Sequence, residues 1–349
     1  MKEILLDLSA AEMADLFKSE GLPAYRAAQV FSELHKNKPF SEMSALPKDL
    51  RAALAEKYAD PAVRIVKTLE SVDGTKKFLF ALQDGNVVEG VLMKYKYGNT
   101  QCVSTQVGCR MNCAFCASGL NGLVRNLTAG EILGQIVAVN AAEGGTAENR
   151  AVTNVVLMGS GEPLDNFDNT VRFLKNLSEK GGIGISRRNV SLSTCGIVPK
   201  IYELADLGFS LNLTISLHSP FDEARKKIMP IAKKYSIAEI LKACEYYFEK
   251  SGRRYIFEYV LIEGENDQKE HADELIRLLK GKPCHVNLIR LNEVKERKMK
   301  AVTDKNAYRF LGLLERGGIS ATLRRQIGAD IDGACGQLRQ KFLESGEEF

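Results

Sequence analysis

Three cysteines within eight residues form the clearest chemical signal in the sequence. Cys109, Cys113 and Cys116 follow a C-x3-C-x2-C spacing. A structural zinc site takes four protein ligands in a closed tetrahedron, whereas a cubane iron–sulfur cluster takes one thiolate per iron. Three thiolates would leave one iron of a 4Fe-4S cluster open for a substrate or cofactor. The spacing favours such a cluster, with a zinc site or a chance grouping as the alternative.

A glycine-rich turn is the second candidate for chemistry. Residues 158–164 read Met-Gly-Ser-Gly-Glu-Pro-Leu, directly after a predicted strand. Glycines let the backbone approach a ligand closely, and the carboxylate of Glu162 at a strand end can bind an amine. By itself, the segment is equally well interpreted as an ordinary loop.

Alternating strands and helices must position these residues. Repeated strand–helix units with apolar strands predict a parallel sheet covered by helices. About six such units predict an α/β fold, a partial (β/α)6-type barrel over residues 101–349, with its site at the C-terminal ends of the strands. Buried strands are predicted over residues 152–158, 189–194, 211–216, 255–262, 285–290 and 320–323, and helices over 171–179, 237–250, 270–279 and 306–315.

The first hundred residues have a different organisation. Residues 1–60 predict short amphipathic helices, beginning with a capping box at Ser9 and Glu12. Because so small a unit buries little apolar surface, we interpret it as an accessory module for a large substrate. Residues 61–100 predict a β-hairpin extension around the turn at 83–86, and a strand over 100–105 leads into the cysteine loop.

The composition indicates a globular protein that contains no membrane span. Apolar residues make up 45% and charged residues 26%. No apolar run reaches the ~20 residues of a span, and we expect no signal peptide. Eight cysteines then favour metal or redox chemistry in the cytoplasm over structural disulfides. The formal charge of +4 weakly favours a nucleic-acid partner, although basic groups such as Arg187-Arg188, Arg225-Lys226-Lys227 and Arg324-Arg325 suit either phosphate contacts or solvated helix faces.

Together with the cysteine motif, the glycine-rich turn resembles that of the radical S-adenosylmethionine (SAM) enzymes, whose open iron is chelated by SAM. Six ordered motifs narrow this resemblance to the RNA adenine methyltransferases of the RlmN and Cfr type. The resemblance covers roughly residues 20–340. The motifs are Gln-Val-Gly-Cys at 106–109, Gly-Glu-Pro-Leu at 161–164, Leu-Ser-Thr-Cys-Gly at 192–196, Ser-Leu-His at 216–218, Val-Asn-Leu-Ile at 286–289 and Asp-Ile-Asp-Gly-Ala-Cys-Gly-Gln-Leu at 330–338.

The resemblance implies a set of site residues. Cys109, Cys113 and Cys116 would ligate the cluster. Three positions depart from the family pattern: Ser160 replaces the usual methionine, and Arg290 and Glu293 replace prolines that are more frequent in RlmN members. The residues that would line the SAM site are Gly161, Glu162, Ser193, Ser216, Leu217, His218 and Asn292.

The resemblance also assigns two further cysteines and a glutamate. An adenine carbon is not a nucleophile, so a thiolate must accept the methyl group first, and this role would fall to Cys335. A second SAM would supply a radical that takes a hydrogen atom from the methylated Cys335, whose methylene radical would add to adenine. Cys102 would then release the product by forming a disulfide, while Glu89 would accept the ring proton. Without the resemblance, both cysteines would be interpreted as packing residues and Glu89 as solvated.

The resemblance therefore implies a methyltransferase that uses two SAM molecules per turnover. It would modify carbon 2 of an adenine near the peptidyl-transferase centre of 23S rRNA, before ribosome assembly is complete, and of an adenine beside the tRNA anticodon. A flavodoxin or ferredoxin would supply electrons, and we expect a monomer. The alternative is Cfr-type methylation of carbon 8, which confers resistance to ribosome antibiotics, although valine at position 107 favours RlmN. A non-catalytic RNA-binding zinc protein is a rival of another class. Cys195, Cys244 and Cys284 are expected to be packing residues.

Overall fold

A ten-stranded mixed sheet forms the centre of the computed structural model, which describes residues 1–146, 148–331 and 337–345. The strand order is β1-β2-β3-β4-β7-β8-β9-β10-β11-β12. Neighbours from β1 to β4 are antiparallel, and neighbours from β4 to β12 are parallel. The strands are β1 Arg64–Glu70, β2 Lys76–Ala81, β3 Val87–Tyr95, β4 Gly98–Cys102, β7 Asn154–Leu157, β8 Val190–Thr194, β9 Asn212–Ser216, β10 Tyr255–Leu261, β11 Cys284–Arg290 and β12 Ala321–Leu323, and a separate ribbon contains β5 Gln106–Gly108 and β6 Leu123–Asn126.

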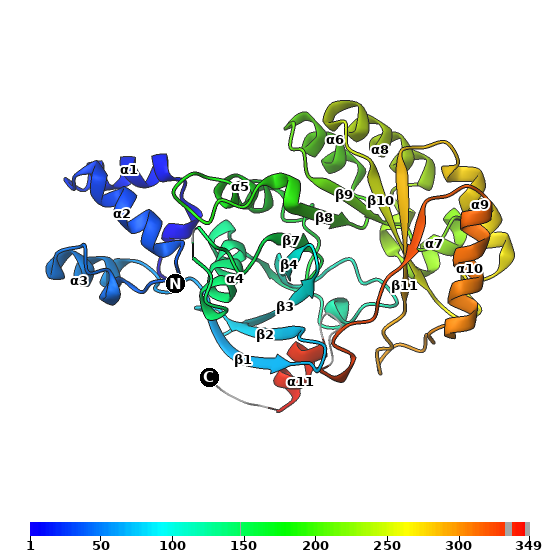
Figure 1. The fold of residues 1–349 in the computed structure, drawn as a ribbon, viewed down its shortest axis with the longest axis horizontal. Coiled ribbons are helices and arrows are strands. Elements are labelled where there is room, and N and C mark those ends of the chain that lie inside the picture. Colours follow the sequence, from blue (N-terminus) through cyan, green and yellow to red (C-terminus); the bar gives the residue numbers. More distant parts are fainter. Residues whose placement is uncertain (147, 332–336, 346–349) are drawn as a thin grey trace.

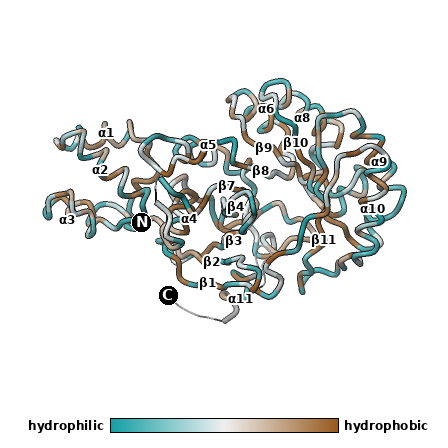
Figure 2. The backbone as a smooth tube through the Cα atoms, viewed as in Figure 1, coloured by the Kyte–Doolittle hydropathy of each residue, from teal (hydrophilic) through white to brown (hydrophobic). Residues whose placement is uncertain are grey.

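Helices that alternate with the parallel strands lie outside the sheet (Figure 1). This arrangement confirms the predicted α/β fold class. Figure 2 shows hydrophobic stretches along the strands and hydrophilic ones in many outer loops. None of the helices in the described ranges has the length and hydrophobicity needed to cross a membrane. The helices are α4 Ala129–Ala142, α5 Phe167–Leu177, α6 Val198–Asp206, α7 Asp222–Ile228, α8 Ile237–Ser251, α9 Lys269–Leu279, α10 Asp304–Arg316 and α11 Gln337–Ser345.

Three short helices precede the sheet and lie at one end of the molecule (Figure 1). Ser9 and Glu12 form the predicted capping box at the start of the first helix. The carboxylate of Asp7 accepts a hydrogen bond of 2.6 Å from the backbone N–H of Gly130, which ties this region to the start of α4. The three helices are α1 Ala10–Ser19, α2 Ala24–Leu34 and α3 Lys48–Lys57.

The hairpin of β2 and β3 is buried on both faces. Side chains alternate between the faces because a strand has a period of two residues. The even-numbered positions pack in the main core, and they include Phe78, Phe80, Val88 and Leu92. On the other face, Leu79 and Val87 pack with Leu338 of α11, while Val91 and Met93 pack with Cys102. The odd-numbered face therefore contacts both the C-terminal helix and the strand that leads to the cysteine loop.

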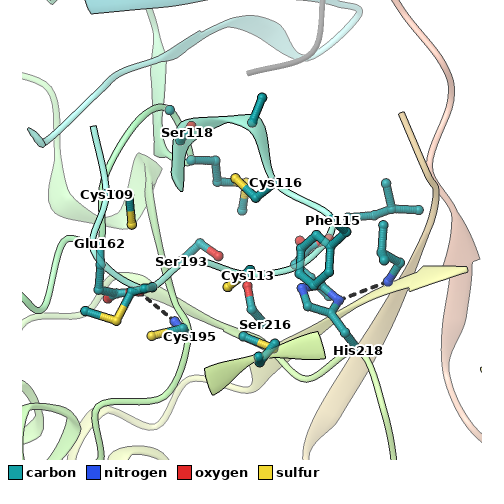
Figure 3. Close-up of a pocket in the computed structure, with 18 of the residues that line it drawn as sticks. Cys109, Cys113, Phe115, Cys116, Ser118, Glu162, Ser193, Cys195, Ser216 and His218 are labelled. Atoms are coloured by element: carbon teal, nitrogen blue, oxygen red, sulfur yellow. Dashed lines mark hydrogen bonds between the residues drawn. The ribbon is translucent and has the colours of Figure 1, made fainter. Parts of the chain in front are cut away.

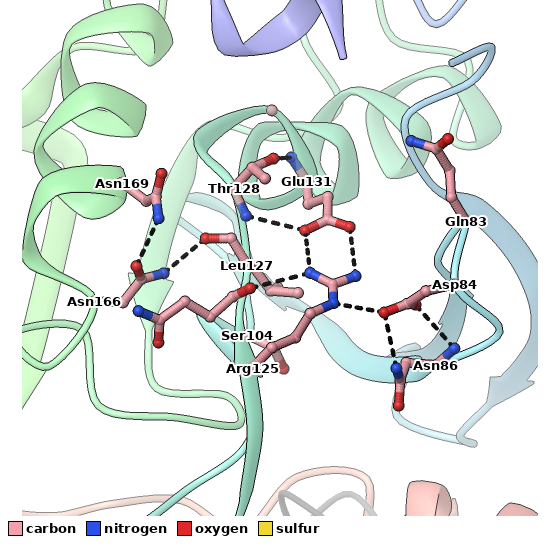
Figure 4. Close-up of polar contacts among 12 residues, drawn as sticks. Gln83, Asp84, Asn86, Ser104, Arg125, Leu127, Thr128, Glu131, Asn166 and Asn169 are labelled. Carbon is pink, nitrogen blue, oxygen red and sulfur yellow. Dashed lines mark hydrogen bonds and ion pairs between the residues drawn. The ribbon is translucent and has the colours of Figure 1, made fainter. Parts of the chain in front are cut away.

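The guanidinium of Arg125 fixes the segment that leaves the cysteine loop. Its two terminal nitrogens donate to Glu131 at 2.7 and 2.8 Å, and Nε donates to Asp84 at 2.6 Å (Figure 4). Glu131 also accepts from the backbone N–H of Thr128, which completes the capping box of α4. Because a bidentate pair constrains orientation as well as distance, this contact joins β6, α4 and the hairpin turn.

Candidate active site

A pocket with a volume of about 290 Å³ lies at the C-terminal ends of the parallel strands. Its walls come from the cysteine loop, the turn after β7 and the ends of β8, β9 and β11 (Figure 3). A second cavity of about 370 Å³ includes residues nearer the N-terminal ends of the strands. The two cavities share Met158, Glu258 and Arg324, so they adjoin inside the curved sheet.

The three cysteines of the motif line this pocket. Backbone contacts hold their loop: the N–H of Cys109 donates to the carbonyl of Gly122 at 2.9 Å, and that of Ala114 donates to Ile228 at 2.8 Å. Burial raises the pKa of the Cys109 thiol to about 12 and also raises that of Cys113. Binding of a cluster at these cysteines must therefore displace the thiol protons.

The arrangement of these thiols fits a cluster better than a single ion. Among the described residues, no group of three or more metal-binding side chains is close enough together to hold one ion. Thiolates on separate irons of a cubane need not converge on a single point. The donor set, three thiols beside an open pocket, thus fits a 4Fe-4S cluster that keeps one iron accessible.

Glu162 places a buried carboxylate at the wall of the pocket. One oxygen accepts from the backbone N–H of Cys195 at 2.7 Å, and the other accepts from Leu164 at 3.0 Å. Burial raises the pKa of this carboxyl, although the backbone donors oppose that effect. A buried carboxylate is stabilised by a cationic partner, so this position suits an amino group of a ligand.

The residues before Glu162 bring the turn against the start of the cysteine loop. Gly161 has a φ of +106°, and a Cβ there would lie 2.6 Å from the Cβ of Gln106. The side-chain carbonyl of Gln106 accepts from the backbone N–H of Glu162 at 2.8 Å. Ser160 is buried, and its hydroxyl donates to the carbonyl of Gly108 at 3.4 Å. The serine that departs from the family pattern is therefore accommodated by a polar contact.

His218 presents a neutral ring to the pocket. Its Nδ1 accepts from the backbone N–H of Val260 at 3.0 Å, so any ring proton resides on Nε2. Burial lowers its pKa to about 3. The ring packs edge-on against Phe115 of the cysteine loop, with 4.7 Å between centroids (Figure 3). A backbone φ of +56°, unusual for a residue other than glycine, turns the chain at this point.

The structure brings most of the predicted site residues together. Leu217 is not among the residues that line the pocket, because its side chain packs in the main core. Only the backbone of Leu217 is left for contact with a ligand. The predicted residues that line the pocket are Cys109, Cys113, Cys116, Gly161, Glu162, Ser193, Ser216, His218 and Asn292.

Comparisons with known proteins agree with this geometry. The Radical SAM superfamily model matches residues 103–279, and the model of the ribosomal RNA large subunit methyltransferase N-terminal domain matches residues 4–59. The chain is 51% identical over 348 residues to the probable dual-specificity RNA methyltransferase RlmN of Clostridium perfringens (strain SM101 / Type A), covering 99% of each chain. It is 50% identical over 343 residues to the protein of the same name from Clostridioides difficile (strain 630), covering 98% of each. The chain belongs to the RlmN family of radical SAM RNA methyltransferases.

A solved structure extends the agreement to the whole fold. The crystal structure of a radical SAM methyltransferase from Sphaerobacter thermophilus superposes with a TM-score of 0.91 at 42% identity, covering 96% of this chain and 98% of that one. Family membership implies a 4Fe-4S cluster and SAM, and the pocket described above contains candidate residues for both.

The cysteine pair expected from the RlmN family is described only in part. Cys335 lies outside the described residues. Cys102, at the end of β4, is buried and packs with Val91, Met158 and Ile327. Because Met158 packs against the apolar cluster that contains Cys102 and also lines the pocket, this cluster adjoins the candidate site.

Glu89 is buried, which an isolated hairpin residue would not be. Its carboxylate lies 3.4 Å from the Nζ of Lys77 and accepts a hydrogen bond of 3.0 Å from the backbone N–H of Arg339, in the first turn of α11. The side chain of Arg339 donates to the carbonyl of Val87 at 2.9 Å. Glu89 thus anchors the helix that follows the Cys335 segment, and it does not line the pocket itself.

Glu258 is a pocket residue that the sequence analysis missed. It is buried on β10 and lines both cavities. One carboxylate oxygen accepts from Asn287 at 3.2 Å, and the other has no hydrogen-bond partner in the described part of the chain. Burial raises its pKa. The sequence does contain a feature that could have identified it: Glu258 is the only charged residue in the predicted buried strand 255–262.

Proposed function

We propose that this protein methylates carbon 2 of adenine in RNA, acting on 23S rRNA and on tRNA. One observation carries the proposal: the three thiols, Glu162 and His218 share a pocket in a chain about half identical throughout to proteins named dual-specificity RNA methyltransferases. Methylation of carbon 8 remains the alternative, because the cysteines would be common to both reactions.

The proposed cofactors are one 4Fe-4S cluster on Cys109, Cys113 and Cys116, and SAM, used twice per turnover. When bound, the cluster supplies the electron that cleaves SAM to a radical. Glu162 binds the amino group of SAM, because its buried carboxylate is held by two backbone donors and favours a cation. An external low-potential donor of the flavodoxin or ferredoxin class supplies the electron.

The remaining pocket residues orient SAM in this proposal. Ser193, Ser216 and Asn292 offer polar groups around the pocket. The neutral ring of His218 and the side chain of Phe115 give it an apolar wall. Leu217 contributes through its backbone only.

Three residues carry out the group transfer: Cys102 and Glu89, which do not line the pocket, and Cys335, which lies outside the described residues. Cys335 accepts the methyl group from the first SAM as a thioether. The radical formed from the second SAM removes a hydrogen atom from the methyl group on Cys335, and the resulting methylene carbon bonds to adenine. Glu89 then takes the ring proton, and the Cys102 thiolate attacks the Cys335 sulfur. The bond between sulfur and the methylene carbon breaks, that carbon takes up a proton to become the methyl group of the product, and a disulfide forms. The one electron left over would return to the oxidised 4Fe-4S cluster. This disulfide must be reduced before the next turnover.

Residues 1–60 are proposed to bind RNA as an accessory domain, with residues 61–100 as the hairpin extension and 101–349 as the catalytic domain. The family model that matches residues 4–59 is described as an rRNA methyltransferase N-terminal domain. The contact between Asp7 and Gly130 would hold this domain against the catalytic one. We propose that the enzyme acts as a monomer on rRNA that is not yet fully assembled into ribosomes.

In vitro methylation of defined RNA, followed by mass spectrometry of the nucleosides, tests the proposal. The protein is purified anaerobically, with about four irons and four sulfides expected per chain from the cubane stoichiometry. We expect 2-methyladenosine in 23S rRNA and tRNA fragments. 8-Methyladenosine would establish the alternative. A colourless protein that holds one zinc and transfers no methyl group would overturn the enzymatic proposal.

A further inference from the structure

Arg225 is a fully buried arginine beside the pocket that the proposed reaction does not use. It lies on α7 with a relative exposure of 0%. Its neighbour Lys227 on the same helix is exposed. A guanidinium is costly to remove from water, so its position requires a compensating interaction.

The guanidinium ties together the strand ends that form the pocket floor. Its Nε donates to the carbonyl of Leu217 at 3.0 Å. One terminal nitrogen, Nη2, donates to the carbonyls of Cys195 at 2.7 Å and Ser216 at 3.0 Å. The other, Nη1, has no hydrogen-bond partner in the described part of the chain. Cys195 and Ser216 both line the pocket together with the three motif cysteines.

Arg225 has no hydrogen bond or ion pair to a carboxylate in the described part of the chain, and Asp222, at the start of the same helix, acts on it only through space. All of its hydrogen-bond acceptors are backbone carbonyls, and no ion pair is found for it among the residues described. An uncompensated buried charge normally destabilises the folded chain. A negatively charged group bound at the adjoining wall of the pocket would compensate this charge more fully than the carbonyls and Asp222 do.

The cysteine loop is packed directly against α7. The backbone N–H of Ala114 donates to the carbonyl of Ile228 at the end of this helix, at 2.8 Å. Ile228 and Met229 form one apolar cluster with Cys195, against which Cys113 packs. Arg225 is thus placed behind the same wall of the pocket as Cys113.

We propose that Arg225 is the counter-charge of the iron–sulfur site and raises the reduction potential of the bound cluster. The inference rests on the cluster assignment in the proposed function. A 4Fe-4S core of charge +2 with three thiolates carries a net charge of about −1, which becomes about −2 when one electron enters from the external donor. A fixed cation stabilises the more negative state more strongly. Arg225 therefore favours uptake of the electron.

Three variants separate the charge of Arg225 from its hydrogen bonds. Arg225→Gln keeps donor groups and removes the charge. Arg225→Lys keeps the charge and loses the planar fork. Lys227→Gln removes the same charge from an exposed site on the same helix and is the matched control.

The measurement is the midpoint potential of the reconstituted full-length protein, followed by electron paramagnetic resonance during a dithionite titration. We expect a more negative midpoint for Arg225→Gln, a midpoint near that of the parent for Arg225→Lys, and no change for Lys227→Gln. An unchanged midpoint in Arg225→Gln, or an equal shift in Lys227→Gln, would overturn the inference.

Iron content covers the case in which a variant does not retain the cluster. If Arg225→Gln takes up no iron while Arg225→Lys does, the requirement for positive charge is upheld. If both variants fail to bind iron while Lys227→Gln succeeds, the hydrogen-bonding fork is what matters and the inference is wrong. A parent protein that holds no cluster would instead refute the cofactor assignment itself.

Discussion

The ammonium group of Lys77 lies 3.4 Å from the carboxylate of Glu89, and both side chains are withdrawn from solvent. Glu89 also accepts from the first turn of α11 through the backbone of Arg339. The proposed proton acceptor therefore also holds α11, the helix that follows Cys335 in the sequence. Any test of its chemistry must separate that role from its structural one.

Glu89→Gln should reduce both stability and methylation. We expect the free energy of unfolding to fall by about 3 kcal/mol, because the Lys77 charge stays buried without that carboxylate. The double variant Lys77→Met/Glu89→Gln removes both charges and should regain most of the stability measured by urea denaturation. Methylation should remain lost in the double variant. Recovery of activity together with stability would show that Glu89 is not the proton acceptor.

Cys102→Ala should trap the protein on its substrate. Without the resolving thiolate, the covalent link between Cys335 and RNA cannot be released, so the purified variant should carry RNA that resists denaturation. The measurement is nucleic-acid content after denaturing gel electrophoresis. Cys284→Ala is the control, because this cysteine has no proposed role, and Cys102→Ala/Cys335→Ala should carry no RNA. A Cys102→Ala protein that turns over normally would exclude the resolving role.

Gly161→Ala should abolish SAM binding. The added Cβ would lie 2.6 Å from Gln106, whose side chain positions the backbone of Glu162. Gly181→Ala is the control, since Gly181 has a φ of +83° and no atom within 4 Å of its Cβ position. That variant should lose only about 1–2 kcal/mol of stability. Equilibrium dialysis with SAM on the cluster-loaded proteins gives the comparison. Equal affinity in both variants would show that the close approach is not needed.

Acid should destabilise the protein partly through His35. Burial lowers its folded-state pKa from about 6.5 to about 4, and its Nδ1 accepts from the backbone N–H of Ile183 at 3.1 Å. Between pH 4 and pH 6.5, the unfolded state therefore binds more protons at His35 than the folded state does. The contribution of His35 to the free energy of unfolding is complete above pH 6.5 and is lost as the pH falls towards 4. Within this range, the free energy of unfolding should change by at most about 1.4 kcal/mol per pH unit through this residue.

The matched variant for this effect is His35→Gln, whose amide oxygen can replace Nδ1 as the acceptor. Urea denaturation at several pH values should give a shallower pH dependence for the variant than for the parent. Comparison with the parent is necessary because burial raises the pKa of Glu162, which acts in the opposite direction. Parallel curves between pH 6.5 and 4 would contradict the assignment.

Local motifs were predictable from the sequence, whereas charges inside the fold were not. The cysteine loop and the turn at Glu162 depend on spacing along the chain, and the structure brings them into one pocket. The pair of Lys77 and Glu89 depends on strand register, since the residue directly opposite Glu89 is Leu79 and Lys77 is its diagonal neighbour. No pattern within either strand reveals that pairing.

Arg225 shows the same limit on a helix. In the sequence it begins a run of three basic residues that suits a solvated face or phosphate contacts. In the fold, successive residues of α7 point in different directions, so Arg225 enters the interior while Lys227 stays exposed. Its burial depends on backbone carbonyls at the ends of β8 and β9, which only the folded sheet brings together.

In the β2–β3 hairpin, the even-numbered and odd-numbered side chains lie on opposite faces. Even-numbered residues support the core, and odd-numbered ones, including Lys77, Glu89 and Val91, face the groups proposed for catalysis. Insertion or deletion of one residue within a strand would exchange the two sets beyond that point. The length of each strand is thus constrained as strictly as any side chain that it carries.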